Sequence, residues 1–289
     1  MDRLLFVFLL TAFINLINTL TRSSRLSGVR TGSLATAISL FGVVYLAASF
    51  ANTLQAPLLA STVEHIIDDT YNRSLAVTPN EVTATRIYQE ALQSLNYKLR
   101  FVILGATAGT VLGILAIPSF VTSFSNAIKA FGQTGSVFRV ILLILFSFFK
   151  RGGGIITFRM SSIGTLKEIM SRRMATPKAF LYWNLTGYSL WTANVLSGLY
   201  AGALYPEFRS TAVLMASIVG NAAIVVSVMM VDPVLAKVTD AVARGEQEEA
   251  ELKQIVFYLA LSNLLGTLLS QAIFQPVAEG LRLLTRWIT

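Results

Sequence analysis

Residues 101–128 of this chain read FVILGATAGTVLGILAIPSFVTSFSNAI, a run of 28 residues without one charged side chain. A helix of about 18 or more such residues is long enough to cross the hydrocarbon core of a bilayer. Since unpaired backbone groups are costly in hydrocarbon, membrane-spanning runs of this kind are helical. Five further charge-free runs reach that length: residues 4–21, 31–63, 179–206, 210–231 and 254–278. Together they predict an all-α, polytopic membrane protein with about six transmembrane helices.

The composition of the whole chain supports the same class of protein. Of the 289 residues, 54% are hydrophobic and 13% are charged, and the mean hydropathy is +0.64. Soluble domains are more charged and less apolar, so we expect one integral membrane domain over residues 1–289. The chain contains no cysteine, which excludes disulfides, thiolate metal sites and a cysteine nucleophile. We expect no cofactor, no metal ion and no nucleic-acid partner.

Basic residues predict which side of the membrane each connection faces. Residues 22–30 contain three arginines, and residues 129–178 contain nine Lys and Arg against one acid. Short basic connections mark the cytoplasmic side, so residues 129–178 are predicted to be a basic cytoplasmic segment and the N-terminus to lie outside. Residues 64–100 then form an external loop.

One apolar stretch does not reach membrane-spanning length. Residues 140–149 (VILLILFSFF) lie between two basic residues, and they are too short to span unless Arg139 is buried. We interpret this stretch as a short re-entrant or interfacial segment. A seven-helix arrangement with the N-terminus inside gives the same balance of basic residues and stays open.

The two ends of the chain show a weak internal similarity. Residues 30–61 resemble residues 209–237, and residues 99–116 align with residues 252–269 without a gap. A repeat of three helices would insert its two copies with opposite topology, which is how many transporters build alternating access. The predicted 3+3 inverted repeat has halves 1–128 and 179–289, joined by the cytoplasmic segment.

Neutral amide side chains are frequent inside the apolar runs. They suit a polar cavity, although hydrogen bonds between helices are an equally ordinary use. Two of them precede Pro57, which interrupts helical hydrogen bonding. The candidates for lining a cavity are Asn18, Asn52, Gln55, Asn194, Asn263 and Gln271.

Glycines at four-residue spacing predict faces where helices pack closely: Gly105, Gly109 and Gly113, and Gly198 with Gly202. Four aromatic residues near one end of the run at residues 179–206 indicate an interfacial belt or a lipid groove: Tyr182, Trp183, Tyr188 and Trp191.

Basic residues next to flexible backbone predict where a phosphate group could bind. Residues 150–154 (KRGGG) combine two cations with glycines whose N–H groups are accessible, although a hinge is the simpler use. The candidates for binding a lipid pyrophosphate are Arg25, Arg30, Lys150, Arg151 and Arg159.

The sequence contains few residues that could form a catalytic site. His65 is the only histidine, and the acids near it are Glu64, Asp68 and Asp69. A hydrolase needs a recognisable set of acid, base and nucleophile, which these residues do not form. We therefore expect no enzyme, with a polyprenyl-phosphate-processing membrane phosphatase as the weaker alternative and a non-transporting envelope scaffold as another.

Two segments resemble a known family. Residues 28–32 (GVRTG), followed by residues 51–59 (ANTLQAPLL), are similar to the Amj family of alternate lipid II flippases in bacteria. The resemblance implies a multi-pass protein of the bacterial plasma membrane that acts in cell wall biogenesis and cell shape. Its partner would be lipid II, the undecaprenyl-pyrophosphate-linked peptidoglycan precursor, carried from the inner to the outer leaflet. The oligomeric state stays open, with a homodimer as one alternative.

Overall fold

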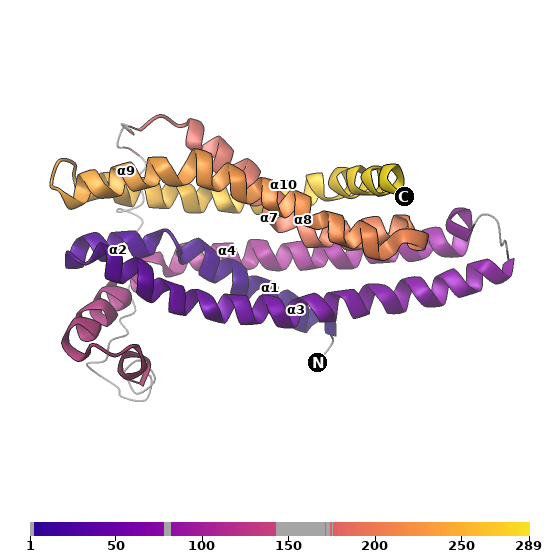
Figure 1. The fold of residues 1–289 in the computed structure, drawn as a ribbon, viewed down its shortest axis with the longest axis horizontal. Helices are drawn as coiled ribbons and strands as arrows, with labels where there is room; N and C mark the ends of the chain where they lie inside the picture. The colour runs from indigo at the N-terminus through magenta and orange to yellow at the C-terminus, as the bar shows by residue number, and fades with distance from the viewer. Residues whose placement is uncertain (1–2, 78–81, 143–170, 172–173, 175) are drawn as a thin grey trace.

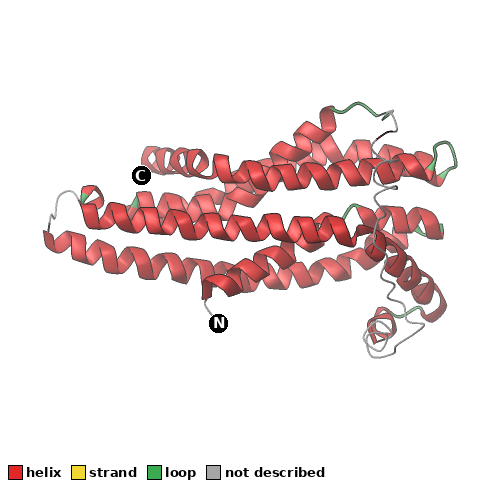
Figure 2. Ribbon diagram, turned by 180° about the vertical axis from the view of Figure 1, so that it is seen from behind, coloured by secondary structure: helices red, strands yellow, loops and turns green. Residues whose placement is uncertain are grey.

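The computed structural model describes residues 3–77, 82–142, 171, 174 and 176–289, and these residues contain helices and no strand (Figures 1 and 2). The α-helices are α1 (Arg3–Leu20), α2 (Ser23–Thr31), α3 (Leu34–Val77), α4 (Arg86–Thr134), α7 (Ala179–Leu204), α8 (Arg209–Val226), α9 (Asp232–Ala243) and α10 (Glu249–Ile288). Short elements η1 (Val82–Ala84), η2 (Pro206–Phe208) and the π-helical η3 (Ser227–Val231) connect or interrupt them. The predicted all-α fold is confirmed.

Most residues of each of the six charge-free runs lie in a long helix of the described chain. Among the residues that the structure describes, five helical segments are long and apolar enough to cross a membrane, and one of them, Pro206–Ala243, comprises η2, α8, η3 and α9. The run at residues 179–206 forms α7, which has 26 residues. A polytopic membrane protein is therefore confirmed, whereas the exact number of spans and the inverted repeat stay predictions. The predicted short segment at residues 140–149 lies mostly outside the described residues.

Residues 64–100 differ from the predicted external loop. Most of them are helical, because α3 continues to Val77 and α4 begins at Arg86. No proline or glycine interrupts residues 64–77, and an Asp69–Arg73 ion pair of 2.8 Å bridges successive turns. The side chain of Thr85 accepts a hydrogen bond from the Tyr88 N–H and so caps α4. The segment is a helical hairpin that extends α3 and α4.

The helices run along one long axis, with α2 and α9 at one end and the C-terminus of α3 with the N-terminus of α4 at the other (Figure 1). We call these the α2–α9 end and the hairpin end, and we call α1–α4 the first half and α7–α10 the second. Toward the hairpin end one buried apolar cluster joins both halves, including Ile67, Leu95 and Tyr200. Toward the α2–α9 end lie two further clusters, one around Phe41 within the first half and one around Leu252 that joins α2 and α4 to the second half.

Glycines hold α1 against α4 and α7 against α8. A Cβ at Gly109 would collide with the backbone of Ala12 in α1, and one at Gly198 would lie 2.6 Å from the Ala216 Cβ in α8. Side-chain-free positions let two backbones approach closely, as the four-residue spacing predicts. The close-packing faces are confirmed.

A buried tyrosine joins the two halves at the hairpin end, and its hydroxyl gives a testable contribution to stability. Tyr88 is fully buried, and its hydroxyl donates a 2.7 Å hydrogen bond to the carbonyl of Ala203. We expect Tyr88→Phe to destabilise the protein by about 1–3 kcal/mol, because the buried carbonyl loses its donor. The midpoint of thermal unfolding in detergent should fall. Tyr97→Phe, at a side chain that is 63% exposed, is the control, and an equal fall in both variants would contradict this role.

Candidate functional site

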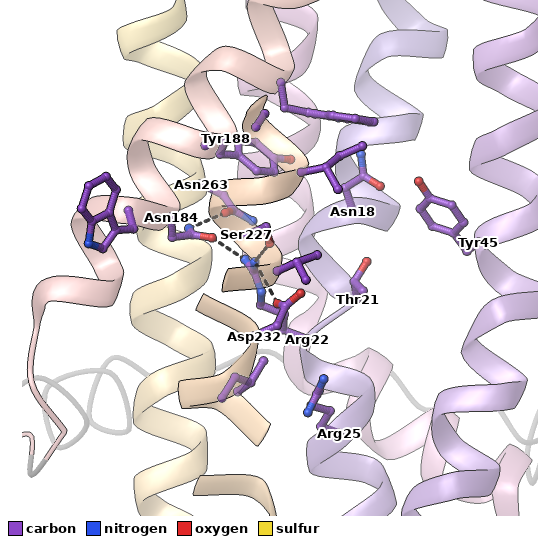
Figure 3. Close-up of a pocket in the computed structure, with 17 residues that line it drawn as sticks. Asn18, Thr21, Arg22, Arg25, Tyr45, Asn184, Tyr188, Ser227, Asp232 and Asn263 are labelled. Atoms are coloured by element: carbon purple, nitrogen blue, oxygen red, sulfur yellow. Dashed lines mark hydrogen bonds and ion pairs between the residues drawn. The ribbon is translucent and has the colours of Figure 1, made fainter. Parts of the chain in front are cut away.

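A cavity of about 410 Å³ lies between the two halves toward the α2–α9 end (Figure 3). It lies beside the apolar cluster around Leu252 and shares Leu235 with it, and polar side chains fill part of the space between the helices. The polar and charged residues that line it are Asn18, Thr21, Arg22, Arg25, Asn184, Ser227, Asp232 and Asn263.

Arg22 is the centre of a hydrogen-bond network across this cavity. One terminal nitrogen donates to the Oδ1 of Asn184 at 2.7 Å, and the other donates to the Oγ of Ser227 at 3.3 Å. Asp232 provides the negative charge, with an Oδ1 that is 3.9 Å from the guanidinium. Asn184 in turn donates to Asn263 at 2.8 Å. Arg22 belongs to the first half and its partners to the second, so the network joins the halves (Figure 3).

Local breaks in two helices bring Arg22 and Asp232 together. Arg22 follows the end of α1 and precedes α2, whose close packing on α3 depends on Gly28. On the other side, the π-helical turn η3 and Pro233 interrupt the helix just before and after Asp232. Pro233 lacks an N–H and leaves a carbonyl of η3 without its helical donor. Interrupted helices and π-helical turns recur at functional sites in membrane proteins.

The side chains that line the cavity carry a net positive charge, because they include two arginines and one carboxylate. The side chain of Arg22 is only 17% exposed, and burial lowers the pKa of this guanidinium, with Asp232 opposing and Arg25 reinforcing the shift. In the part of the chain that the structure describes, Arg25 makes no hydrogen bond or ion pair. Two guanidinium groups therefore face one cavity beside a single carboxylate. Such an arrangement favours an anion with several oxygens, such as a phosphate or pyrophosphate.

A second cavity of about 220 Å³ continues from the first toward the hairpin end. The two cavities share Asn18, Tyr45 and Trp191. The amide and hydroxyl side chains that line the second are all neutral: Thr11, Asn15, Asn18, Tyr45, Ser49, Asn52, Gln55, Thr192 and Asn194. Gln55 is buried and donates to Thr11 at 2.7 Å. A track of amides and hydroxyls therefore leads from the two arginines to the closed apolar cluster.

The structure gathers most of the amides that were predicted to line a cavity. Asn18 and Asn263 line the first cavity, while Asn52, Gln55 and Asn194 line the second. Gln271 lies elsewhere, because its side chain donates to the carbonyl of Arg100 at 3.0 Å and so joins α10 to α4.

The predicted pyrophosphate-binding residues are dispersed. Arg25 lines the first cavity, whereas Arg30 lies on the surface in a 2.8 Å ion pair with Glu249. Lys150, Arg151 and Arg159 lie outside the described residues.

Two central residues were missed by sequence reasoning. Arg22 counted only as a marker of topology, although it follows Asn15 and Asn18 at helical spacing and so shares their face. Asn184 was one of many amides, yet Tyr188 and Trp191 follow it at the four- and three-residue spacings of one helix face. All three line the first cavity.

The acidic residues considered for an enzyme do not form a joint site. Asp68 pairs with Arg209 at 2.6 Å, and Asp69 pairs with Arg73. Within the described ranges, no group of three or more His, Asp or Glu side chains could hold a metal ion.

Comparison with known proteins identifies the family to which this chain belongs. Residues 10–285 match the family described as Amj, Alternate to MurJ. The chain is 35% identical to the lipid II flippase Amj of Bacillus subtilis (strain 168) over 288 residues, which cover 99% of this chain and 97% of that protein. No solved structure matches the chain.

Proposed function

The chain belongs to the Amj family, and we propose that it is a lipid II flippase of the bacterial plasma membrane. It carries the undecaprenyl-pyrophosphate-linked peptidoglycan precursor from the cytoplasmic to the outer leaflet. The relative that covers almost the whole chain has this activity by name. The observation in the structure that supports it most is the pair of arginines at a cavity between the two halves.

The charges of the first cavity fit the pyrophosphate of such a lipid. Arg22 and Arg25 are its ligands in this proposal, and the N–H groups of a guanidinium match the spacing of phosphate oxygens. Asn184 and Ser227 orient Arg22, because each accepts one of its hydrogen bonds. An arginine held in place in this way loses less side-chain entropy when the anion binds.

The neutral amides fit the sugar and peptide part of the headgroup. Asn18, Asn52 and Asn194 offer donors and acceptors without a fixed charge, which suits hydroxyl and amide groups. The two cavities, of about 410 and 220 Å³, lie one beyond the other along the bundle. The headgroup would pass along this polar track from the arginines toward the hairpin end.

The position of the first cavity supports a state that is open toward the cytoplasm, beside an apolar cluster in which Leu26 and Val121 of the first half pack with Leu252 of the second. Short basic connections mark the α2–α9 end as cytoplasmic, and the first cavity lies at that end. At the hairpin end, the common apolar cluster and the Asp68–Arg209 ion pair close the space between the halves. Movement of one half against the other would open this end, as alternating access requires.

The weaker alternatives lack comparable support. A phosphatase would need Glu64, Asp68 or Asp69 beside the lipid phosphate, but Asp68 is paired with Arg209 and Asp69 with Arg73. A scaffold would not explain why two arginines line one cavity beside a single carboxylate. A homodimer stays a prediction.

The function is tested in bacterial cells that have been depleted of their own lipid II flippases. We expect expression of this chain to restore lipid II in the outer leaflet, measured as cleavage by an externally added lipid II-degrading toxin. Cells with an empty vector are the control and should show no cleavage. Absence of cleavage despite abundant membrane-inserted protein would contradict transport and favour an enzyme or a scaffold.

A further inference from the structure

The first cavity changes in character from its inner wall to its rim. Asn184 and Asn263 on the inner wall are 3% and 2% exposed, and both take part in the Arg22 network. One part of the rim is apolar or aromatic and half exposed, with Tyr45 at 41%, Ile224 at 45% and Val228 at 56%, while the exposed Thr21 and the 42% exposed side chain of Asp232 form a polar part. A polar interior and a partly apolar rim in one cavity suit an amphipathic ligand.

The apolar rim residues come from two different helical segments that belong to different halves. Tyr45 lies on α3, while Ile224 and Val228 lie on α8 and η3. Both segments fall within helices that are apolar enough to cross the membrane. A group that leaves the cavity between them therefore enters hydrocarbon without crossing water.

We propose that this rim, formed by Tyr45, Ile224 and Val228, binds the first isoprene units of the polyprenyl chain while Arg22 and Arg25 bind its pyrophosphate. The inference rests on the proposed function, and it assigns a separate subsite for the tail. A cavity of about 410 Å³ lies toward the small end of ligand pockets, roughly 300–1,000 Å³, and cannot enclose a long polyprenyl chain. The chain leaves through the rim and stays in the bilayer during transport.

The charges favour this lipid over an ordinary phospholipid. A polyprenyl pyrophosphate has two adjacent phosphates beside its first isoprene unit, which matches two guanidinium groups beside an apolar rim. A phospholipid has a single phosphodiester, which matches only one of the two guanidinium groups. Tyr45 also adds an aromatic face against which branched hydrocarbon packs well.

Neighbouring residues on the same helix offer matched controls. Val225 and Met229 are 52% and 68% exposed, more than Ile224 and Val228 respectively, yet neither lines the cavity. Contact with bulk lipid alone would therefore label the control positions at least as strongly as the rim.

The test places photoreactive benzoylphenylalanine at Ile224 or Val228, or at Val225 or Met229, in the full chain reconstituted in phospholipid nanodiscs. Radiolabelled undecaprenyl pyrophosphate is the probe, and radiolabelled phosphatidylglycerol is the second probe. We expect several-fold more undecaprenyl pyrophosphate at the two rim positions than at the two controls, and no such preference for phosphatidylglycerol. In an Arg22→Gln background the rim labelling should fall by about tenfold or more, because the pyrophosphate loses a charged ligand.

Binding of the same probe to the unmodified protein separates the two hypotheses. If undecaprenyl pyrophosphate binds but labels the rim and control positions equally, the tail subsite is wrong while the pyrophosphate site stands. Equal rim labelling by phosphatidylglycerol overturns the subsite as well, because the rim would then be ordinary lipid-facing surface. If the probe does not bind at all, the proposed function itself fails.

Discussion

Arg22→Gln should reduce lipid II transport to near the level of the empty vector, with lipid pyrophosphate binding weakened by about 10- to 100-fold. A hydrogen bond to a charged group contributes about 1.5–3 kcal/mol, and glutamine supplies no positive charge for the pyrophosphate. The loss would be measured by toxin cleavage in cells and by binding of labelled undecaprenyl pyrophosphate to purified protein. Arg22→Lys keeps the charge but loses the two-pronged geometry, so it should fall between the wild type and Arg22→Gln.

The matched control for this variant is Arg30→Gln. It removes the same charge from the end of α2, but Arg30 pairs with Glu249 on the surface and does not line the cavity. Because surface ion pairs contribute about 0–1 kcal/mol, transport should stay close to that of the wild type. An equal loss in both variants would show that net basic charge at this end, rather than the cavity, explains the effect.

A fold defect is the other explanation for loss of transport by Arg22→Gln. The variant leaves Asp232 without its cation, although the side chain of Asp232 is 42% exposed and can be solvated. The double variant Arg22→Gln with Asp232→Asn removes both charges and restores the local balance. If this double variant is monodisperse in detergent and still fails to bind the lipid, the loss reports on ligand binding.

Gly109→Leu should prevent the protein from folding into its native bundle. A side chain at this position collides with the backbone of Ala12, so α1 and α4 have to separate along their whole contact. Overpacking in a core that can adjust costs about 1–3 kcal/mol, and a backbone neighbour cannot move aside as a side chain does. Separation would also disturb Asn15, Asn18 and Arg22, which α1 and the following turn present to the cavities.

Folding is measured as the fraction of detergent-extracted protein that elutes as a single species in size-exclusion chromatography. Gly42→Leu is the control, because Gly42 lies in the apolar part of α3 and a Cβ there meets nothing within 4 Å. We expect the control to elute like the wild type. A Gly109→Leu protein that also elutes like the wild type would contradict the close packing of α1 on α4.

The sequence was sufficient to predict the structure of a segment where the composition of that segment alone determines it. A run such as residues 101–128 enters the membrane because every one of its side chains tolerates hydrocarbon, and its backbone must then be helical. The four-residue glycine spacing of α4 likewise specifies a close-packing face before its partner is known. Resemblance of residues 28–32 and 51–59 to the Amj family pointed to the family that the comparisons then showed.

Sequence patterns predicted less well whether a given polar residue lines a cavity or joins two helices. Gln55 and Gln271 have the same side chain in similar apolar surroundings, yet one lines a cavity and the other joins α10 to Arg100. Both uses satisfy the amide equally well, so local sequence does not distinguish them. Residues 64–100 were wrongly predicted to be a loop for a similar reason, because the polar residues of a long helix look like those of a loop.

The position of Arg22 was decided by the tertiary structure alone. Its partners Asn184 and Asp232 lie far away in the chain, and they meet it only because two helix breaks and the packing of the two halves bring them to one cavity. By itself the sequence determined that this chain is a helical membrane protein with polar groups to satisfy, since the cost of placing each residue in hydrocarbon is a local quantity. Which polar groups satisfy one another, and which are left facing a ligand, depends on distances between helices that only the folded bundle defines.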